Sequence, residues 1–505
     1  MQPLRSWVAK VTSGPYSPLV AVAAVIAGLG LLECLLPLRT TVQIGADEGM
    51  EVAKAELCLK GHQLYTEIWN DQPPLHTFLV TFVLRHFSST MLGPRLLTVA
   101  FAVVLLIAVY LIVSRFSGDW VGVLAAGFLI GSPGFLDLSS SCMLEIPSLA
   151  TAVAALCVLR MRWRAEWRLP ELLSGALFAA ALQIKLVPSI YLALVPLVFW
   201  LERSSSSKTT KQLVLSLGLF AVSLFAFYVL VDAMIEGGAY LHHFQQTWQS
   251  HFGDSKSLEY GSAQDFPFQW VILFKNWDLT LPAIVGVAFL AQSSRTSPGH
   301  LLPLAWLALT LLVFGIHRPW WPYYYVHLAV PLSWCAAAGI VGLAGACKPG
   351  PKVLRLGLLG LFALCCVPWI IGRLYLEASG IRHSPQTFAS PVLAQVARFK
   401  PFTKSLFADR PIYSFHTDIP LPSNLAVLPV KRFWAGEMTN AKLTSELGDL
   451  KPGLLLLEND TRERPFHKLL ETEYRLVYVD TQNRLYAHSS IAKRALFWSS
   501  VPPPH

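Results

Sequence analysis

Apolar runs of roughly span length recur along the chain as far as about residue 376. A helix needs about 20 apolar residues to cross the hydrocarbon core of a bilayer. The windows that we take as spans lie at 17–37, 93–114, 120–138, 142–160, 170–187, 188–202, 212–234, 268–291, 301–317, 323–346 and 353–375. They predict a mostly α-helical, polytopic membrane bundle of about eleven spans. The division of 170–202 into two spans is the most ambiguous step.

Basic residues between these windows predict the orientation of the bundle. They fall in the short loops 160–168, 203–211, 292–300 and 347–355. A cytoplasmic N-terminus places all four loops inside, which is the positive-inside pattern. The same parity places a second group of segments on the outer face. These are the loop 38–92, the turn before Glu145, the end of the fifth span at Lys185, the loop 235–267, the turn 317–325 and everything after 376. The unusual polar residues therefore gather on one face of the membrane.

After residue 376 the apolar runs shorten to strand length. Strands are expected near 405–407, 453–457, 475–479 and 484–487, and helical spacing appears at 388–399, 440–449 and 463–472. We therefore divide the chain into a transmembrane domain at 1–376 and a small extracytoplasmic α/β domain at 377–505. Nothing in the second domain indicates catalysis, and we interpret Asp409, His416 and Asp418 as solvated surface residues.

The outer loop at 38–92 carries the densest cluster of carboxylates. Asp47 to Lys60 has helical spacing, with carboxylates in its first turn and Gly61 as a natural stop. Pro73 and Pro74 precede an apolar stretch at 75–87 that is too short to cross alone. The loop therefore predicts two amphipathic helices on the outer surface. Three further carboxylates are expected on their solvated faces: Glu51, Glu56 and Glu67.

Composition supports the membrane assignment and narrows the function. Of the 505 residues, 54% are hydrophobic and only 14% are charged, and the mean hydropathy is +0.48. An integral membrane protein follows from this composition. The net charge of +9 resides mainly in the short loops, where topology explains it, so nucleic-acid binding is not expected. Six of the eight cysteines lie in or beside apolar segments, and none forms a CxxC pair.

Asp47 and Glu48 follow the first span and admit two interpretations. The simpler one is an N-cap with a helix-dipole partner, worth about 1 kcal/mol. The other is that one carboxylate, held close to the bilayer, accepts a proton from an attacking hydroxyl. The pair alone favours the simpler interpretation.

An ordered set of motifs changes that preference. The outer loop contains Asp47-Glu48, Tyr65 and the segment 71–75, which reads DQPPL. Further along come GPR at 93–95, CMLEIP at 142–147, Lys185 and HRPWWPYYYVHLAVPL at 317–332. In this order the motifs closely resemble the GT-C membrane glycosyltransferases of the protein O-mannosyltransferase and aminoarabinose-transferase type. The resemblance covers roughly residues 40–335.

The resemblance implies roles for individual residues. Asp47 matches the catalytic base that activates the acceptor, with Glu48 as its partner. Glu145 stands where relatives often have an aspartate, which implies a part in acceptor or metal binding, and we group Asp71 with it. Gln72 stands where some relatives have lysine, so no phosphate contact is carried over to it. A divalent cation, Mg²⁺ or Mn²⁺, is a possible cofactor.

The chemistry of a lipid-phosphate donor suits other residues on the outer face. Its phosphate lies at the headgroup level and needs cations there. Candidates for this contact are Arg95, Lys185, His317 and Arg318. For Lys185, simple snorkelling is an equal alternative. Aromatic residues could form a platform for the lipid and sugar or an ordinary interfacial belt. They are Tyr65, Trp320, Trp321, Tyr323, Tyr324 and Tyr325.

The sequence therefore predicts a membrane-bound hexosyl- or pentosyltransferase of cell-envelope glycans. A sugar would pass with inversion from a polyprenyl phosphate to an acceptor hydroxyl on the outer face of a bacterial inner membrane. The acceptor could be a lipid such as lipid A, a glycan or a protein. One alternative is a transporter or flippase of lipid-linked sugars, although the chain lacks repeated halves and midplane charges. A weaker alternative is an oligosaccharide polymerase or ligase.

Overall fold

The computed structural model describes residues 17–159, 168–205, 209–236, 240–252, 266–345, 352–384, 387, 390–458 and 467–492. The chain divides into two compact units, each assembled from three separate stretches. The first comprises Met1–Pro37, Thr98–Val231 and Asp265–Arg382, and the second comprises Leu38–Leu97, Asp232–Gln264 and His383–His505. The predicted domain boundary at 376/377 stays a prediction.

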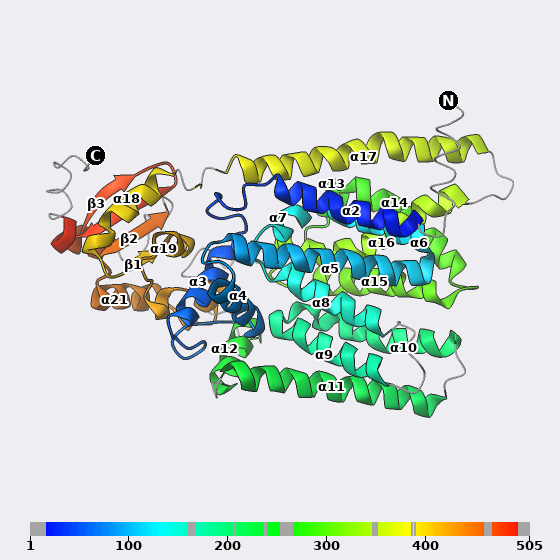
Figure 1. Ribbon diagram of the computed structural model, residues 1–505, viewed down its shortest axis with the longest axis horizontal. Helices are drawn as coiled ribbons and strands as arrows, with labels where there is room; N and C mark the ends of the chain where they lie inside the picture. Colours follow the sequence, from blue (N-terminus) through cyan, green and yellow to red (C-terminus); the bar gives the residue numbers. More distant parts are fainter. Residues whose placement is uncertain are drawn as a thin grey trace. The chain divides into compact units, whose positions relative to one another are not determined.

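The first unit is helical throughout its described part, and its helices run in a bundle (Figure 1). Its α-helices are α2 (Ser17–Cys34), α5 (Leu92–Ser117, whose first residues belong to the second unit), α6 (Asp119–Ile130), α7 (Phe135–Ser139), α8 (Glu145–Val158), α9 (Leu169–Ile184), α10 (Leu194–Ser205), α11 (Thr210–Glu236, whose last residues belong to the second unit), α13 (Val271–Lys275), α14 (Trp277–Ser293), α15 (Leu301–Ile316), α16 (Tyr325–Gly345) and α17 (Lys352–Arg382). Short 3₁₀ turns lie at η1 (Val187–Ala193), η2 (Pro298–His300) and η3 (Pro322–Tyr324).

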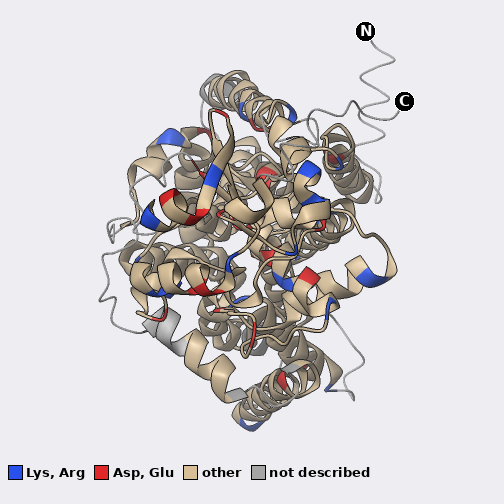
Figure 2. Cartoon of the chain, turned by 90° about the vertical axis from the view of Figure 1, so that its left-hand side faces the viewer, with Lys and Arg blue, Asp and Glu red and all other residues tan. Residues whose placement is uncertain are grey.

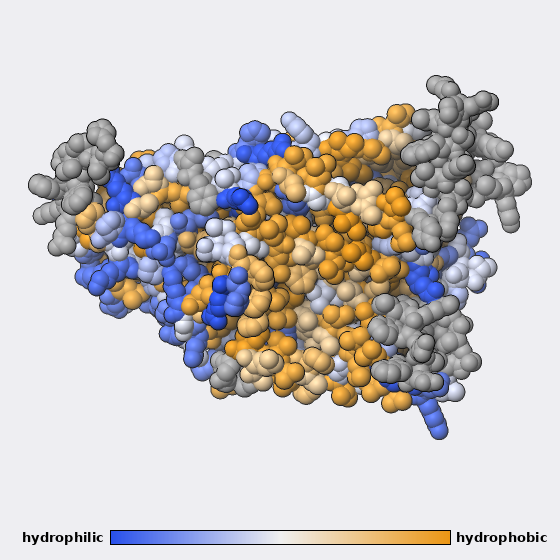
Figure 3. Space-filling model, viewed as in Figure 1, coloured by the Kyte–Doolittle hydropathy of each residue, from blue (hydrophilic) through white to orange (hydrophobic). Residues whose placement is uncertain are grey.

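Six helices among the described residues are long and apolar enough to cross a membrane. They occupy Ser17–Cys34, Leu92–Ser117, Thr210–Ile235, Pro298–Ile316, Pro322–Ala344 and Gly357–Arg382. The other five predicted windows hold shorter apolar helices of 10–17 residues. Large apolar side chains such as Phe225 on α11 and Leu364 on α17 are exposed, and the surface over these helices is largely hydrophobic (Figure 3). A lipid-facing bundle has this surface, so the predicted membrane-embedded helical fold is confirmed.

Glycine lets two helices of this unit approach closely. A Cβ at Gly286 of α14 would lie 1.7 Å from the carbonyl oxygen of Cys335 on α16. A Cβ at Gly339 of α16 would lie 2.3 Å from the carbonyl oxygen of Pro282 on α14. Membrane helices associate through such small residues because lipid offers no hydrophobic drive for helix pairing. The α14–α16 contact therefore requires glycine on both sides.

Ionisable groups inside the first unit are paired or hydrogen-bonded. Asp278 and Arg373 form an ion pair, and the Arg373 guanidinium also donates to the carbonyl oxygen of Gly131. Glu33, a carboxylate within the first apolar window, is buried and accepts a 2.6 Å hydrogen bond from Ser139. Isolated charges are costly at this depth. These contacts account for all three ionisable residues as structural groups.

The second unit combines surface helices with a small α/β fold. Its helices are α3 (Glu48–Leu59), α4 (Leu75–His86), α12 (Tyr240–Phe252), α18 (Pro391–Phe399), α19 (Ile412–Thr417), α20 (Val430–Trp434), α21 (Asn440–Leu450) and α22 (His467–Glu473), with 3₁₀ turns η4 (Lys400–Phe402) and η5 (Ser423–Leu425). Its strands are β1 (Leu406–Ala408), β2 (Leu454–Glu458), β3 (Tyr474–Val479) and β4 (Asn483–His488). The strand order is β1-β2-β4-β3, in which β1 and β2 are parallel and the other pairs antiparallel.

The four strands lie within about a residue of their predicted positions, because each is a short apolar run between breakers. One face of the sheet forms a core with α20, α21 and α22, built around Phe407, Phe433, Leu447 and Leu455. Acidic and basic residues are interspersed on the elements of this unit rather than gathered by sign (Figure 2). The predicted small α/β fold is confirmed.

The structure corrects the interpretation of Asp409 and His416 as solvated residues. His416 is half-buried, and its Nε2 lies 3.0 Å from the carbonyl oxygen of Val42. Burial lowers the pKa of His416, although its hydrogen bond to Val42 opposes the shift. Asp409 is also half-buried and accepts a 2.9 Å hydrogen bond from the backbone N–H of Glu458. Of the three residues, Asp418 alone is exposed.

Candidate active site

Asp47 lies at the N-terminus of α3, in the second unit. It is the N-cap residue, yet its side chain makes no capping hydrogen bond, and it is half-buried. Its backbone is in the helical region at φ −97° and ψ −2°, whereas capping residues usually adopt extended angles. The helix dipole favours the ionised carboxylate at this end. The simple N-cap interpretation is therefore wrong for the side chain of Asp47.

Glu48, the first residue of α3, is fully buried and paired with Arg95. The guanidinium donates from Nε to Oε1 at 2.8 Å and from Nη2 to Oε2 at 2.9 Å. Its Nη1 also donates to the carbonyl oxygens of Leu38 and Thr41, at 2.6 and 2.8 Å. Glu48 Oε2 further accepts the backbone N–H of Ile44 at 2.7 Å. This network holds the chain on both sides of Asp47 in place.

The geometry of Arg95 argues against its predicted contact with a phosphate. Both Arg95 and Glu48 have 0% of their surface exposed. Both terminal nitrogens and Nε of the guanidinium are hydrogen-bonded within the unit. A phosphate would have to replace these bonds and enter a site closed to solvent. Arg95 instead supports the loop, and Glu48 acts as its counter-ion.

A second buried network corrects the placement of Glu51 on a solvated face. Lys54 donates to Glu51 at 2.8 Å and to Asn70 at 2.9 Å, and His76 lies 3.3 Å from Glu51. All four side chains are buried. Burial alone would raise the pKa of Glu51, but the Lys54 ammonium and the hydrogen bond with His76 outweigh it and hold the pKa below its usual range. The network joins α3 to the segment before α4.

Tyr65 and Asp71 have structural contacts within the same unit. Tyr65 adopts a positive φ of 68°, is buried, and donates from its hydroxyl to the carbonyl oxygen of Gln72 at 2.8 Å. Its ring stacks on His243 at 4.6 Å. Asp71 accepts a 2.9 Å hydrogen bond from Gln72 and lies 3.5 Å from the Lys431 ammonium. These contacts tie the loop to α12 and to the α/β fold.

Glu145 and Lys185 meet in the first unit. Glu145 is the first residue of α8, and Lys185 follows α9 in an extended conformation. Their side chains form an ion pair, and the ammonium also lies 4.9 Å from the centre of the Tyr323 ring and 5.5 Å from that of Tyr324. The Glu145 carboxylate is fully buried, and its Oε2 has no hydrogen-bond partner in the described part of the chain. Lys185 is thus a buried paired cation, which excludes simple snorkelling.

The five aromatic residues of the turn at 320–325 divide into two groups. Trp320, Tyr324 and Tyr325 are buried, and Trp320 packs edge-on against Phe268 at 4.7 Å. Trp321 and Tyr323 are half-exposed and stack on each other at 6.2 Å. Only these two side chains have the exposure that a lipid or sugar platform requires.

His317 and Arg318 are exposed at the end of α15, and the His317 ring lies 5.9 Å from that of Tyr324. Sequence reasoning missed a buried residue nearby, His327 on α16. Its Nδ1 lies 2.8 Å from the Tyr191 hydroxyl. A histidine in an otherwise apolar span was the available signal for it. It also missed the Asp278–Arg373 pair, although both residues lie in apolar windows.

No group of three or more His, Cys, Asp or Glu side chains in the described ranges is arranged to hold a metal ion. Metal sites for Mg²⁺ or Mn²⁺ use carboxylate oxygens together with waters or substrate phosphates. Glu145 has one carboxylate oxygen without a protein partner. The divalent cation stays a prediction.

Three comparisons with known proteins bear on this geometry. The family model of dolichyl-phosphate-mannose-protein mannosyltransferases matches residues 71–230. Comparison with curated protein sequences gives no match. The fold is similar to that of ArnT from Cupriavidus metallidurans bound to undecaprenyl phosphate, with a TM-score of 0.59 and 15% identity over 94% of this chain and 98% of ArnT. It is also similar to the oligosaccharyltransferase AglB from Archaeoglobus fulgidus in complex with an inhibitory peptide and a dolichol-phosphate, with a TM-score of 0.57 and 13% identity over 97% of this chain and 76% of AglB.

These findings define the class of the protein. At such low identities the structural likeness establishes the fold, and the family model adds evidence from the sequence itself. The chain is an integral membrane glycosyltransferase with the GT-C fold. The family model bears out the predicted resemblance to protein O-mannosyltransferases over residues 71–230, and the fold is similar to that of ArnT.

Proposed function

We propose that the protein transfers a sugar from a polyprenyl-phosphate donor to an acceptor hydroxyl, with inversion at the anomeric carbon. One structural observation carries the proposal: Asp47 leaves the N-terminus of α3 uncapped while the neighbouring Glu48 is locked to Arg95. The likeness to ArnT bound to undecaprenyl phosphate, and to AglB with a dolichol-phosphate, supports the class of donor.

The transfer balances as a single displacement. Asp47 accepts the proton of the acceptor hydroxyl while the oxygen of that hydroxyl attacks the anomeric carbon of the sugar. The bond from this carbon to the phosphate oxygen breaks, and polyprenyl phosphate leaves with the bonding pair. Because attack and departure take place on opposite faces of the anomeric carbon, the configuration inverts. Glu48 and Arg95 serve as positioning residues that fix Asp47.

The departing phosphate needs positively charged groups that are in place before the bond breaks. We assign this contact to Lys185, His317 and Arg318 and no longer to Arg95. The ion pair with Glu145 holds the Lys185 ammonium in a fixed place, so no reorganisation is needed when charge develops on the phosphate. Trp321 and Tyr323 are assigned to the donor lipid or sugar because they are the half-exposed rings of the turn.

We place this reaction on the outer face of a bacterial inner membrane, with the N-terminus cytoplasmic. The basic loops support that orientation. Part of this evidence, the residues 160–167, 206–208 and 346–351, lies outside the described residues. Fusion of a periplasm-dependent reporter enzyme to the C-terminus tests the orientation. An active fusion is expected. Activity only with a cytoplasm-dependent reporter would contradict this orientation.

An assay of the purified chain in lipid nanodiscs tests the transfer. The chain is given a radiolabelled polyprenyl-phosphate sugar together with membrane-lipid or glycan extract. The proposal predicts a labelled product together with stoichiometric free polyprenyl phosphate. In sealed vesicles, movement of the labelled donor across the bilayer without any glycosyl product would instead favour the flippase. Lys275, an exposed residue in the last turn of α13, offers a matched control, because Lys275→Met should leave transfer unchanged while Lys185→Met abolishes it.

A further inference from the structure

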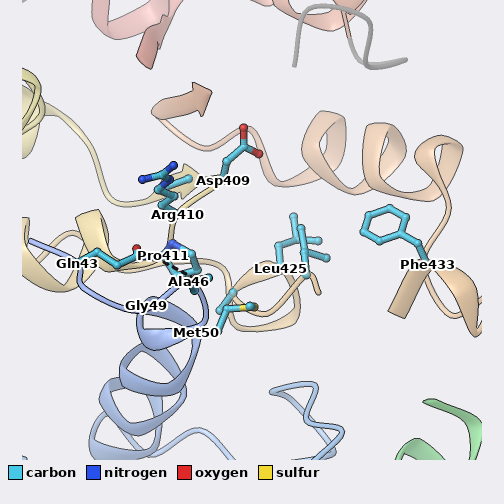
Figure 4. Close-up of a pocket in the computed structure, with 12 residues that line it drawn as sticks. Gln43, Ala46, Gly49, Met50, Asp409, Arg410, Pro411, Leu425 and Phe433 are labelled. Carbon is cyan, nitrogen blue, oxygen red and sulfur yellow. Dashed lines mark hydrogen bonds between the residues drawn. The ribbon is translucent and has the colours of Figure 1, made fainter. Parts of the chain in front are cut away.

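A pocket in the second unit lies beside the loop that carries Asp47. Its walls come from the start of α3, from the segment after β1 and from the chain between η5 and α20. Polar side chains at the pocket are Gln43, Asp409 and Arg410, and apolar ones are Met50, Leu425 and Phe433. Figure 4 shows Asp409 and Arg410 on one segment, with Gln43 below them and Leu425 and Phe433 to the other side.

Hydrogen bonds hold the three polar side chains, and Gln43 and Arg410 keep atoms that can bond a ligand. Asp409 follows β1 and is fixed by two hydrogen bonds to β2: its backbone N–H donates to the carbonyl oxygen of Leu456, and its carboxylate Oδ2 accepts from the backbone N–H of Glu458. Arg410 pairs through Nε with Glu458, while its two terminal nitrogens have no hydrogen-bond partner among the described residues. Gln43 donates to two backbone carbonyls, and its Oε1 is buried without a partner in that same part of the chain.

The position of the pocket in the fold favours a ligand. Asp409 and Arg410 follow the carboxyl end of β1, and Glu458 ends the parallel neighbour β2. In open α/β sheets, ligands bind outside the carboxyl ends of parallel strands. Opposite them, a Cβ on Gly49 would lie 3.1 Å from the Ile412 backbone nitrogen, so glycine allows α3 to approach α19. Close packing of these two helices fixes the shape of the wall.

The chemistry of the lining selects a neutral, hydroxyl-rich ligand. An anion would meet the Asp409 carboxylate, and the Arg410 charge is already balanced by Glu458. An acyl chain would bury these polar groups without partners, which is costly. A sugar ring satisfies both sides, because its hydroxyls donate to Gln43 and Asp409 and accept from Arg410, while its C–H face packs on Met50 and the other apolar residues.

We propose that this pocket binds a neutral sugar unit of the acceptor, which makes the acceptor a glycan or a glycan-bearing molecule. Ala46 and Gly49 line the pocket and flank Asp47 in the sequence. A sugar unit held there would anchor the acceptor beside the proposed base. The inference rests on the proposed function, because it assigns the acceptor of that same transfer.

Binding of neutral methyl glycosides (mannoside, galactoside and xyloside) to the full chain in nanodiscs tests the inference, measured by saturation-transfer NMR. At least one glycoside should bind. Arg410→Gln should weaken that binding tenfold or more, and Met50→Trp should abolish it by filling the pocket. Arg475→Gln should leave it unchanged, because Arg475 is an exposed arginine on β3 at the far edge of the sheet. If Met50→Trp fails to fold, the nearly isosteric Gln43→Met replaces it and should also weaken binding.

Two results would overturn the inference: no glycoside binds, or binding is equal in the wild type, Arg410→Gln and Gln43→Met. Donor turnover measured on the same samples separates this outcome from failure of the proposed function. Transfer to a serine peptide or a sugar-free lipid, without glycoside binding, would refute the acceptor site and keep the transferase. Glycoside binding without any turnover of the labelled donor would refute the transferase and leave a glycan-binding pocket.

Discussion

Replacement of Arg95 by methionine separates a positioning role from a phosphate contact. The substitution removes a bidentate bond to Glu48 and two bonds to backbone carbonyls in a site with no exposed surface. Loss of one partner of a buried ion pair costs about 3–5 kcal/mol, because the other charge stays buried without compensation. For a unit of this size such a loss lowers the unfolding midpoint by about 10 °C.

Thermal unfolding of the purified protein and donor kinetics on the same samples provide the measurement. Arg95→Met should lower the midpoint, and the double variant with Glu48→Met should recover part of it by removing the orphaned carboxylate. Arg115→Met is the matched control, because Arg115 is exposed near the other end of α5. An unchanged midpoint in Arg95→Met, combined with a raised KM for the donor, would refute the positioning role and restore the phosphate contact.

Three further predictions concern other contacts. Gly286→Val should prevent assembly of the bundle, seen as loss of the monodisperse peak in size-exclusion chromatography, because its side chain would overlap the backbone of α16. Gly218→Ala, at an open position on α11, should be tolerated. Lys185→Met should lower the unfolding midpoint, and adding Glu145→Gln should restore the midpoint but not transfer; restored transfer would exclude the phosphate role. Because the pKa of Glu51 is lowered from its unfolded value of 4.5, the ionised carboxylate stabilises the protein at pH values above 4.5. This stability is lost as the pH falls through the folded pKa. The free energy of unfolding of Glu51→Gln should therefore depend less on pH below about 5.

Local patterns sufficed to predict the elements of the fold. The helix at 47–60 was marked by its spacing and by Gly61, which has a φ of +96°, and it appears as α3. The apolar runs near 453–457 and 484–487 became the paired strands β2 and β4, because runs of that length suit a small sheet. Within the described ranges, the eleven apolar windows likewise hold eleven apolar helices, of which six have full spanning length.

Partners distant in the sequence could not be predicted in the same way. Glu51 has the spacing of a solvated helical face, yet Asn70 and His76 fold over it from beyond the end of α3. Arg95 suited a phosphate contact as a cation near the outer face, but Glu48, 47 positions earlier, occupies its guanidinium. Neither the sequence around Arg95 nor that around Glu48 predicts that the two residues pair. The resemblance placed both residues in one motif set without giving their contact.

The most direct test of the central claim compares the wild type and Asp47→Asn in transfer from a labelled polyprenyl-phosphate sugar, with the anomeric configuration of donor and product read by NMR. The substitution keeps the shape of the side chain and removes the base, and such a base contributes about 10²–10⁴-fold to the rate. We expect an inverted product from the wild type, and for Asp47→Asn a loss of at least a hundredfold in kcat with unchanged thermal stability. Full transfer by Asp47→Asn, or a product that retains the donor configuration, would contradict it.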